Sequence, residues 1–105
     1  MSKQKPGLLP PIHPGEILVG EFMKPLGLSM NRVGRDLRAP VTRIADILHG
    51  RRGISADTAL RLSRYFGTTA EFWMNLQSAY DLEVEQRQSI KQIRRDVHPV
   101  NAVAR

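Results

Sequence analysis

Arginine is the residue whose number and placement suggest chemistry in this sequence. Between Ser29 and Gly67 the chain carries eight arginines, three aspartates and no lysine, which gives this block a net charge of +5. The arginines are Arg32, Arg35, Arg38, Arg43, Arg51, Arg52, Arg61 and Arg64. The planar guanidinium group binds a phosphate or the edge of a guanine through two parallel hydrogen bonds, a geometry that lysine cannot offer. The block therefore favours a nucleic acid as the partner over a merely solvated basic surface.

The basic block is followed at once by an acidic one. From Thr68 to Gln86 the chain carries four carboxylates and no lysine or arginine, a net charge of −4. The formal charge of the whole chain is +6. The positive charge is thus concentrated on one part of the chain, which the elements of that part must present to the partner.

Catalytic and metal-binding chemistry finds no support in the sequence. The chain has no cysteine, which excludes disulfide scaffolds, zinc ribbons and thiol nucleophiles. His13, His49 and His98 lack the spacing of metal ligands and have no carboxylate cluster beside them. No serine has a convincing arrangement of histidine and aspartate around it, and there is no glycine-rich phosphate loop. We expect neither an enzyme nor a metal site nor a cofactor.

The stretch from Ser29 to Gly53 is predicted to form two short helices joined by a tight turn. Ser29 is a good N-cap for a helix over 30–37, a turn follows at 38–40, and Pro40 can open a second helix over 40–49. Large apolar residues recur at helical spacing: Val33, Leu37, Ile44, Ile47 and Leu48. Facing apolar stripes leave the polar side chains outward, as a helix-turn-helix that enters the DNA major groove requires. The outward residues are Arg32, Arg35, Arg43, Asp46 and His49.

Two residues in this stretch depart from a regular helix-turn-helix. Gly34 stands where a buried alanine usually packs between the helices, and it should weaken its helix by up to about 1 kcal/mol. Arg38 stands where the turn usually has glycine, often with a positive φ. Either Arg38 strains the turn slightly or the turn takes another conformation.

Three further helices are expected around this motif. The first runs from about Pro14 to Lys24, is stopped by Pro25 with Gly27, and buries Leu18, Phe22, Leu26 and Leu28. The fourth spans about 56–66, with Ser55 as its cap, Gly67 as its end, and a buried stripe of Ala59, Leu62 and Phe66. The fifth starts at a Thr68 or Thr69 cap and continues to about 95, although its later part is only weakly amphipathic. The fold class is therefore all-α, with five helices and an extended fifth helix.

At 105 residues the chain is long enough for one domain with a single modest core. We expect a flexible N-terminal arm over 1–12, the helix-turn-helix domain over 13–83, and a C-terminal helical extension and tail over 84–105. No apolar run is long enough to span a membrane, and residues 1–11 lack the apolar stretch of a signal peptide. A cytoplasmic protein is the expected class.

The runs HPGEILVGEFMKPLGLSMNRVGRDL and RIADILHGRRGISADTALRLSRYFGTTAEFWMNLQSAYDLE closely resemble the HigA antitoxin family, also described as plasmid-maintenance antidote proteins. These proteins belong to the lambda-repressor-like helix-turn-helix class, and the resemblance covers about 13–83. It implies a homodimeric repressor that binds an inverted repeat of double-stranded DNA in its own promoter. It also implies that the protein masks a HigB-type toxin, a small messenger-RNA-cleaving ribonuclease.

The resemblance also suggests roles for particular residues. The positions that contact bases in lambda-repressor-like proteins correspond here to Val41, Thr42, Ala45 and Asp46, with Arg43 reaching either a guanine or a phosphate. Asp46 could instead pair with Arg43 or Arg35. The positions expected near phosphates are Ser29, Asn31, His49, Arg51 and Arg52, although Ser29 is better explained as an ordinary helix cap.

The aromatic residues of the fifth helix are expected to be structural. Phe72, Trp73, Leu76 and Tyr80 have helical spacing beside the acidic block, which favours core or dimer packing over the stacking of single-stranded bases. Two alternatives to an antitoxin remain open on the sequence. One is a solitary transcription regulator without a toxin, and the other is a protein-interaction module whose arginine face binds an acidic protein.

Overall fold

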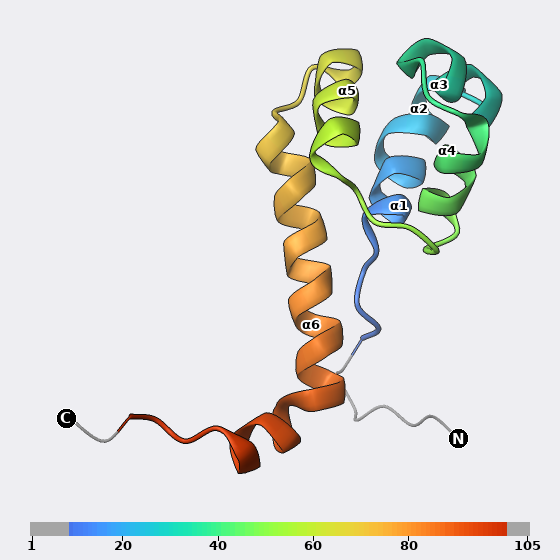
Figure 1. Cartoon of the computed structure of the whole chain (residues 1–105). Coiled ribbons are helices and arrows are strands. Elements are labelled where there is room, and N and C mark those ends of the chain that lie inside the picture. Colours follow the sequence, from blue (N-terminus) through green and yellow to red (C-terminus); the bar gives the residue numbers. More distant parts are fainter. Residues whose placement is uncertain (1–8, 101–105) are drawn as a thin grey trace, which may run out of the picture.

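The computed structural model describes residues 9–100, and all the secondary structure in that range is helical (Figure 1). The elements are α1 (Pro14–Ile17), η1 (Leu18–Met23), α2 (Lys24–Leu26), α3 (Met30–Leu37), α4 (Val41–Leu48), α5 (Ala56–Phe66) and α6 (Ala70–Asp96). The first three follow one another without a break, so they form one helix whose middle part is wound as a π-helix. Residues 9–100 thus have the five-helix, all-α architecture that the sequence predicts. Residues 1–8 of the arm expected over 1–12, and residues 101–105 of the extension and tail expected over 84–105, lie outside the described residues.

The first helix ends two residues later than expected, because Pro25 does not stop it. Proline lacks an N–H group and its ring collides with the carbonyl four residues back in a regular α-helix. Here the preceding turns are widened, and the Lys24 N–H donates to the carbonyl five residues back, that of Val19, which gives the proline ring room. The helix ends at Gly27, whose φ of 65° only glycine adopts without strain. The extra turn leaves Leu26 63% exposed, so the expectation that it is buried was wrong.

The N-terminus of α1 lies tightly against the C-terminal end of α4. A Cβ atom at Gly15 would lie 2.2 Å from the carbonyl oxygen of Ile47, so only glycine fits there. His13 caps α1: its Nδ1 accepts from the Gly15 N–H at 2.9 Å, and Glu16 accepts from the His13 N–H at 3.4 Å. Burial of the imidazole lowers the pKa of His13, although the nearby carboxylates of Glu16 and Asp81 oppose the shift.

One apolar core joins all five helices. Its buried members are Leu18, Met23, Val33, Leu37, Ile44, Ile47, Ile54, Ala59, Leu62 and Trp73. The first half of α6 closes this core: Trp73 is fully buried, and its indole N–H donates to Thr68 Oγ1 at 2.7 Å. Phe22, Phe66 and Phe72 pack around the indole ring. The second half of α6 extends beyond the core (Figure 1); Ile93 on it is exposed, and so is Leu82 just before it. In the described range, no helix is sufficiently long and apolar to cross a membrane.

Candidate nucleic-acid interface

The helix-turn-helix consists of α3, a three-residue turn and α4. Ser29 caps α3, with its Oγ accepting from the Arg32 N–H at 3.0 Å. Arg38 takes up the left-handed conformation of the turn, with φ 57° and ψ 42°, so it accepts the strain that glycine would avoid. The Ala39 N–H then donates to the Gly34 carbonyl at 2.9 Å. A Cβ at Gly34 would lie 3.2 Å from the Ala39 carbonyl oxygen, so glycine lets this turn close tightly on α3.

Helix α4 is one residue shorter at each end than the sequence suggested. Pro40 has extended backbone, with ψ 140°, and therefore serves as the residue before the helix instead of its first residue. His49 has left the helical conformation, and Gly50 with φ 74° ends the helix as expected. Ile44 and Ile47 are fully buried, and they fix which side of α4 faces outward.

The candidate base-reading residues lie on the first two turns of α4. Val41 is 40% exposed and Thr42 is also exposed, so both can reach a groove. Arg43, Ala45 and Asp46 are half-buried. Methyl groups of valine and threonine suit the methyl group of thymine, and the threonine hydroxyl suits a base edge or a phosphate. The start of α4 therefore presents a small, mostly uncharged surface, with arginines beside it.

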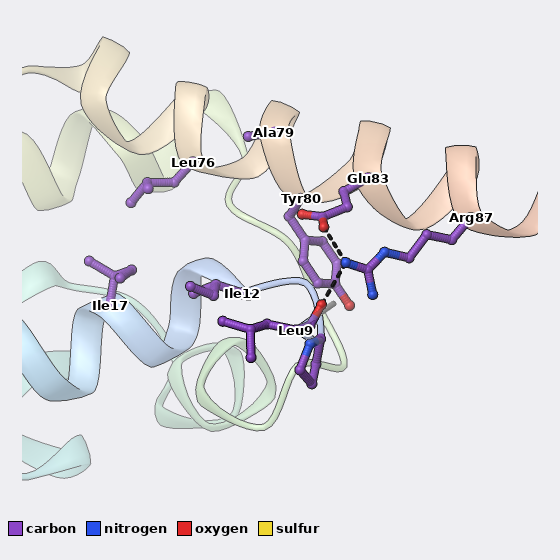
Figure 2. A pocket seen from close by; sticks show the side chains of 9 residues that line it. Leu9, Ile12, Ile17, Leu76, Ala79, Tyr80, Glu83 and Arg87 are labelled. Carbon is purple, nitrogen blue, oxygen red and sulfur yellow. Dashed lines mark hydrogen bonds and ion pairs between the residues drawn. The ribbon is translucent and has the colours of Figure 1, made fainter. Parts of the chain in front are cut away.

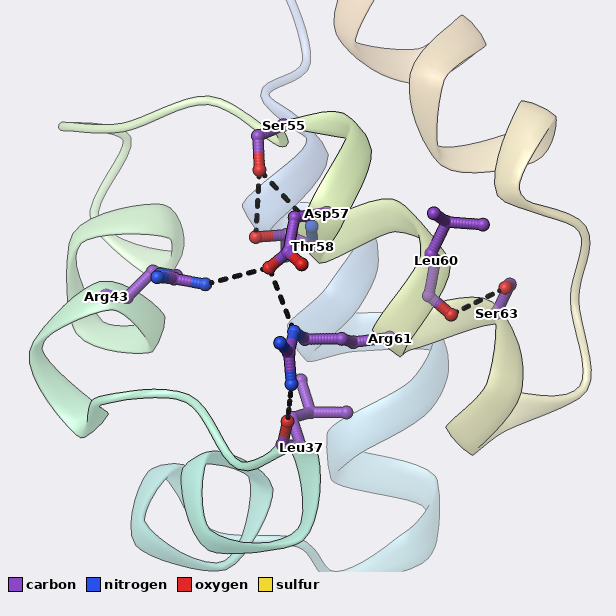
Figure 3. Close-up of polar contacts among 8 residues, drawn as sticks. All are labelled: Leu37, Arg43, Ser55, Asp57, Thr58, Leu60, Arg61 and Ser63. Atoms are coloured by element: carbon purple, nitrogen blue, oxygen red, sulfur yellow. Dashed lines mark hydrogen bonds and ion pairs between the residues drawn. The ribbon is translucent and has the colours of Figure 1, made fainter.

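Arg43 is held by a charge network that links α4 to α5 (Figure 3). Its Nη1 donates to Asp57 Oδ2 at 3.2 Å, and Arg61 Nε donates to the same oxygen at 2.9 Å. Arg61 also donates through Nη1 to the Leu37 carbonyl at 2.9 Å, at the end of α3. Hydrogen bonding by Arg61, with added attraction from Arg43, lowers the pKa of Asp57. This network orients Arg43 along the α4–α5 side of the surface.

Asp46 does not pair with Arg43 or Arg35, as the sequence had suggested, but with Arg51. Its Oδ1 accepts from Arg51 Nε at 3.0 Å, and its backbone carbonyl accepts from the N–H groups of Arg51 at 2.8 Å and Arg52 at 3.2 Å. The chain folds back over the end of α4 at Gly50, which brings this loop to Asp46. The pairing was not evident in the sequence because it depends on that reversal.

The candidate phosphate-contacting residues lie at the two ends of the motif. Arg51 and Arg52 are exposed on the loop after α4, and Asn31 is exposed in the first turn of α3. The His49 ring lies 2.8 Å, through Nδ1, from the Ala45 carbonyl. Because a carbonyl can only accept, Nδ1 carries the proton and Nε2 is left for another partner. Ser29 Oγ is engaged as a cap, which agrees with its structural interpretation.

A helix-turn-helix family model matches residues 19–73 of the chain. Virulence-associated protein I of Dichelobacter nodosus is 51% identical over 84 residues, which are 78% of this chain and 78% of that protein. Antitoxin HigA-1 of Vibrio cholerae is 31% identical over 72 residues, covering 69% of this chain and 68% of that protein. The structure of Pseudomonas aeruginosa antitoxin HigA with higBA promoter matches 86% of this chain and 98% of its own, with a TM-score of 0.83 and 47% identity.

The chain belongs to the HigA family of helix-turn-helix proteins. The segments that carried the resemblance meet in space in this HigA-family structure. His13 lies beside Gly50 and its ring packs edge-on against Tyr80, with centroids 4.8 Å apart. Gln77 receives a hydrogen bond from the Ile54 N–H at 2.7 Å. The three segments that carried the resemblance, at 13–16, 50–54 and 76–81, thus contact one another. Their contacts support the candidate phosphate-contacting loop from the side of α6.

Three polar residues of the HigA-family site were not found by sequence reasoning. Arg61 carries a local signal, since Asp57 stands four residues before it at the spacing of a helical ion pair. The capping role of His13 is indicated by the Glu16 that follows at the spacing of a capping box. Gln77 carries no such signal, because its partner, Ile54, is 23 residues away.

Proposed function

We propose that this HigA-family protein is the antitoxin of a type II toxin–antitoxin system, acting as a dimeric, sequence-specific repressor of its own operon. The observation that carries the proposal is the exposed first turn of α4, with Val41 and Thr42 outward and Ile44 and Ile47 buried. An α-helix presented in this way enters the major groove of B-form DNA. The relative from Pseudomonas aeruginosa with a matching fold was solved with promoter DNA, which supports the same partner.

The proposed contacts with bases and with the DNA backbone are assigned from the positions of the side chains. Val41 and Thr42 read base edges from the exposed first turn of α4, and the half-buried Arg43, Ala45 and Asp46 beside them complete the proposed base-reading set. The backbone contacts come from the two ends of the motif: Asn31, His49, Arg51 and Arg52, with the Ser29 cap beside them. Arginine contacts with phosphates release counterions, so binding falls as salt rises.

Dimerisation would place two copies of α4 in successive major grooves about 34 Å apart on a near-palindromic operator. The part of α6 from Leu82 onward supports this part of the proposal, because Leu82 and Ile93 are exposed on a helix that extends beyond the core. A helix with so little packing of its own gains stability from a second surface. Neutralisation of a HigB-type ribonuclease is the second proposed activity, and it rests on family membership.

A gel-shift titration against the protein's own upstream DNA, at two salt concentrations, tests the DNA-binding part. Arg51→Ala and Arg52→Ala should weaken binding to all sequences about equally, because phosphates carry no sequence information. Thr42→Ala and Arg43→Ala should change the preference between operators. If all four variants altered affinity alike, the division into base and phosphate contacts would be wrong. If the wild-type protein bound no DNA at either salt concentration, the result would instead favour a protein-interaction module.

Co-expression with the adjacent reading frame tests the antitoxin part. Co-purification of a small basic protein whose ribonuclease activity is suppressed in the complex would support it. Binding to upstream DNA without any such partner would instead indicate a solitary transcription regulator. The two experiments together separate the three candidate functions.

A further inference from the structure

Gly53 and Ile54, which follow Arg51 and Arg52 in the loop, contact the side chain of Gln77 on α6. The Ile54 N–H donates to Gln77 Oε1 at 2.7 Å, a short and well-formed bond. Ile54 is only 3% exposed, so water cannot easily replace this acceptor. A Cβ atom at Gly53 would lie 2.8 to 2.9 Å from three atoms of the Gln77 amide. Gly53 and Ile54 therefore rest directly on that amide group.

The orientation of the Gln77 amide is fixed by its partners. Asp81, one helical turn further along α6, accepts from Gln77 Nε2 at 2.9 Å. An ionised carboxylate can only accept and a backbone N–H can only donate, so the amide oxygen must face Ile54 and its nitrogen must face Asp81. The two directional hydrogen bonds of the Gln77 amide thus fix the position of the loop relative to α6.

The other end of the loop is also held in place. Gly50 lies against the His13 ring, which packs on Tyr80 of α6 at a centroid distance of 4.8 Å. Between these two anchors the N–H groups of Arg51 and Arg52 donate to the Asp46 carbonyl. The path of the basic loop is therefore set by α4 on one side and by α6 on the other.

We propose that Gln77 is a positioning residue for DNA binding. Its amide, oriented by Asp81, fixes Gly53 and Ile54 and so presents Arg51 and Arg52 to the DNA backbone. The position of α6 is in this way coupled to DNA affinity. The inference deepens the proposed function and rests on it.

Gln77→Met tests the proposal, because methionine keeps the length of the side chain and removes both hydrogen bonds. Gln86→Met is the matched control, since Gln86 is an exposed glutamine on the same helix. The dissociation constant for upstream DNA should rise on the order of tenfold in Gln77→Met, as expected for losing the hydrogen bond that holds a binding loop. The slope of log K against log salt should fall by about 0.9 for each phosphate that the loop no longer reaches. Gln86→Met should match the wild type in both measurements.

The salt slope separates positioning from mere stability. If Gln77 only stabilised the fold, Gln77→Met that is still folded by circular dichroism would bind with unchanged affinity and slope, and the proposal would be overturned. A rescue provides the second test. Gln77→Glu sets two carboxylates against each other and should weaken binding, whereas Gln77→Glu combined with Asp81→Asn restores a donor facing an acceptor. The double variant should recover affinity to within about twofold of the wild type; a double variant as weak as the single one would refute the positioning role.

Amide hydrogen exchange, measured without DNA, tests the hydrogen bond between Ile54 and Gln77 directly. The Ile54 amide should exchange faster in Gln77→Met than in the wild type, and unchanged exchange would overturn the proposal. Wild-type protein that fails to bind DNA would refute the proposed function and the positioning role together. If the wild type bound DNA and Gln77→Met bound it with the same affinity and salt slope, only the positioning role would be refuted.

Discussion

Gly15→Ala is a single-methyl change that tests how α1 and α4 meet. The added Cβ would lie 2.2 Å from the Ile47 carbonyl oxygen and 3.1 Å from the Leu48 Cα, where ordinary contacts are 3.4–4 Å. All the atoms approached belong to backbone, so no side-chain rotation can relieve the overlap. The two helices must instead separate by about 1 Å, which disturbs the close packing of the core around them.

The expected cost follows from two opposing effects. Overpacking of this kind costs about 1–3 kcal/mol, and the upper end applies because backbone must move. Alanine is a better helix former than glycine, which returns up to about 1 kcal/mol. The free energy of unfolding should therefore fall by about 2 kcal/mol, equivalent to a melting temperature lower by roughly 8–16 °C.

Urea unfolding followed by circular dichroism measures this difference directly, and Gly20→Ala is its internal control. Gly20 lies on the same helix with nothing within 4 Å of its added Cβ, so alanine there should raise stability by up to about 1 kcal/mol. The reasoning would be refuted if Gly15→Ala unfolded at the wild-type urea concentration. Equal losses in both variants would likewise show that the contact with α4 is not the cause.

Three further changes probe local features of the fold. Arg38→Gly should raise the free energy of unfolding by about 1 kcal/mol in urea titrations, because glycine adopts the left-handed turn at φ 57° without strain. Thr68→Val should lower it by about 1–2 kcal/mol in the same assay, since the indole N–H of the buried Trp73 loses its acceptor. Because burial lowers the pKa of His13 from its usual value of 6.5, the folded protein prefers the neutral ring, and thermal melts should show stability falling as the pH drops below about 6.5. His13→Asn retains a capping side chain without an imidazole and should reduce that dependence.

Each of these has an outcome that would contradict it. A melting temperature of Arg38→Gly below that of the wild type would mean that the arginine side chain stabilises the turn more than its backbone strains it. If Thr68→Val had the same free energy of unfolding as the wild type, another group would have to accept the hydrogen bond of the indole N–H. Equal pH dependence of His13→Asn and the wild type between pH 7 and 5 would remove His13 as the titrating group.

Local signals predicted most of the helix boundaries. The caps at Ser29, Ser55 and Thr69 and the glycine ends at Gly50 and Gly67 were all recognisable, because a cap needs only the few residues beside it. Pro25 was misjudged, since a π-helical turn that accommodates a proline has no simple sequence pattern.

The candidate site was predictable in outline and not in its polar contacts. The outward placement of Val41 and Thr42 follows from the buried isoleucines, which are visible in the sequence as a periodic pattern. The Arg43–Asp57 pair joins two helices across 14 residues, and the Ile54–Gln77 bond spans 23. Such pairings depend on how the helices pack, and propensity and periodicity do not specify that.

The separation of charge along the chain has a consequence for how the protein meets DNA. The basic block lies on α3, α4 and α5, whereas the acidic block lies on the first two-thirds of α6, at the opposite side of the domain from α3 and α4 (Figure 1). The groove close to this acidic helix, lined by Leu9, Ile12, Tyr80, Glu83 and Arg87, is likewise on the α6 side (Figure 2). The basic charge returns further along α6, where Arg87, Lys91, Arg94 and Arg95 follow the acidic block with only Asp96 against them. The acidic stretch therefore separates two basic surfaces, and within a Debye length of about 8–10 Å it disfavours an approach to DNA by its own side of α6. Encounters through the basic surfaces are favoured instead, and the association rate constant should decline steeply with ionic strength.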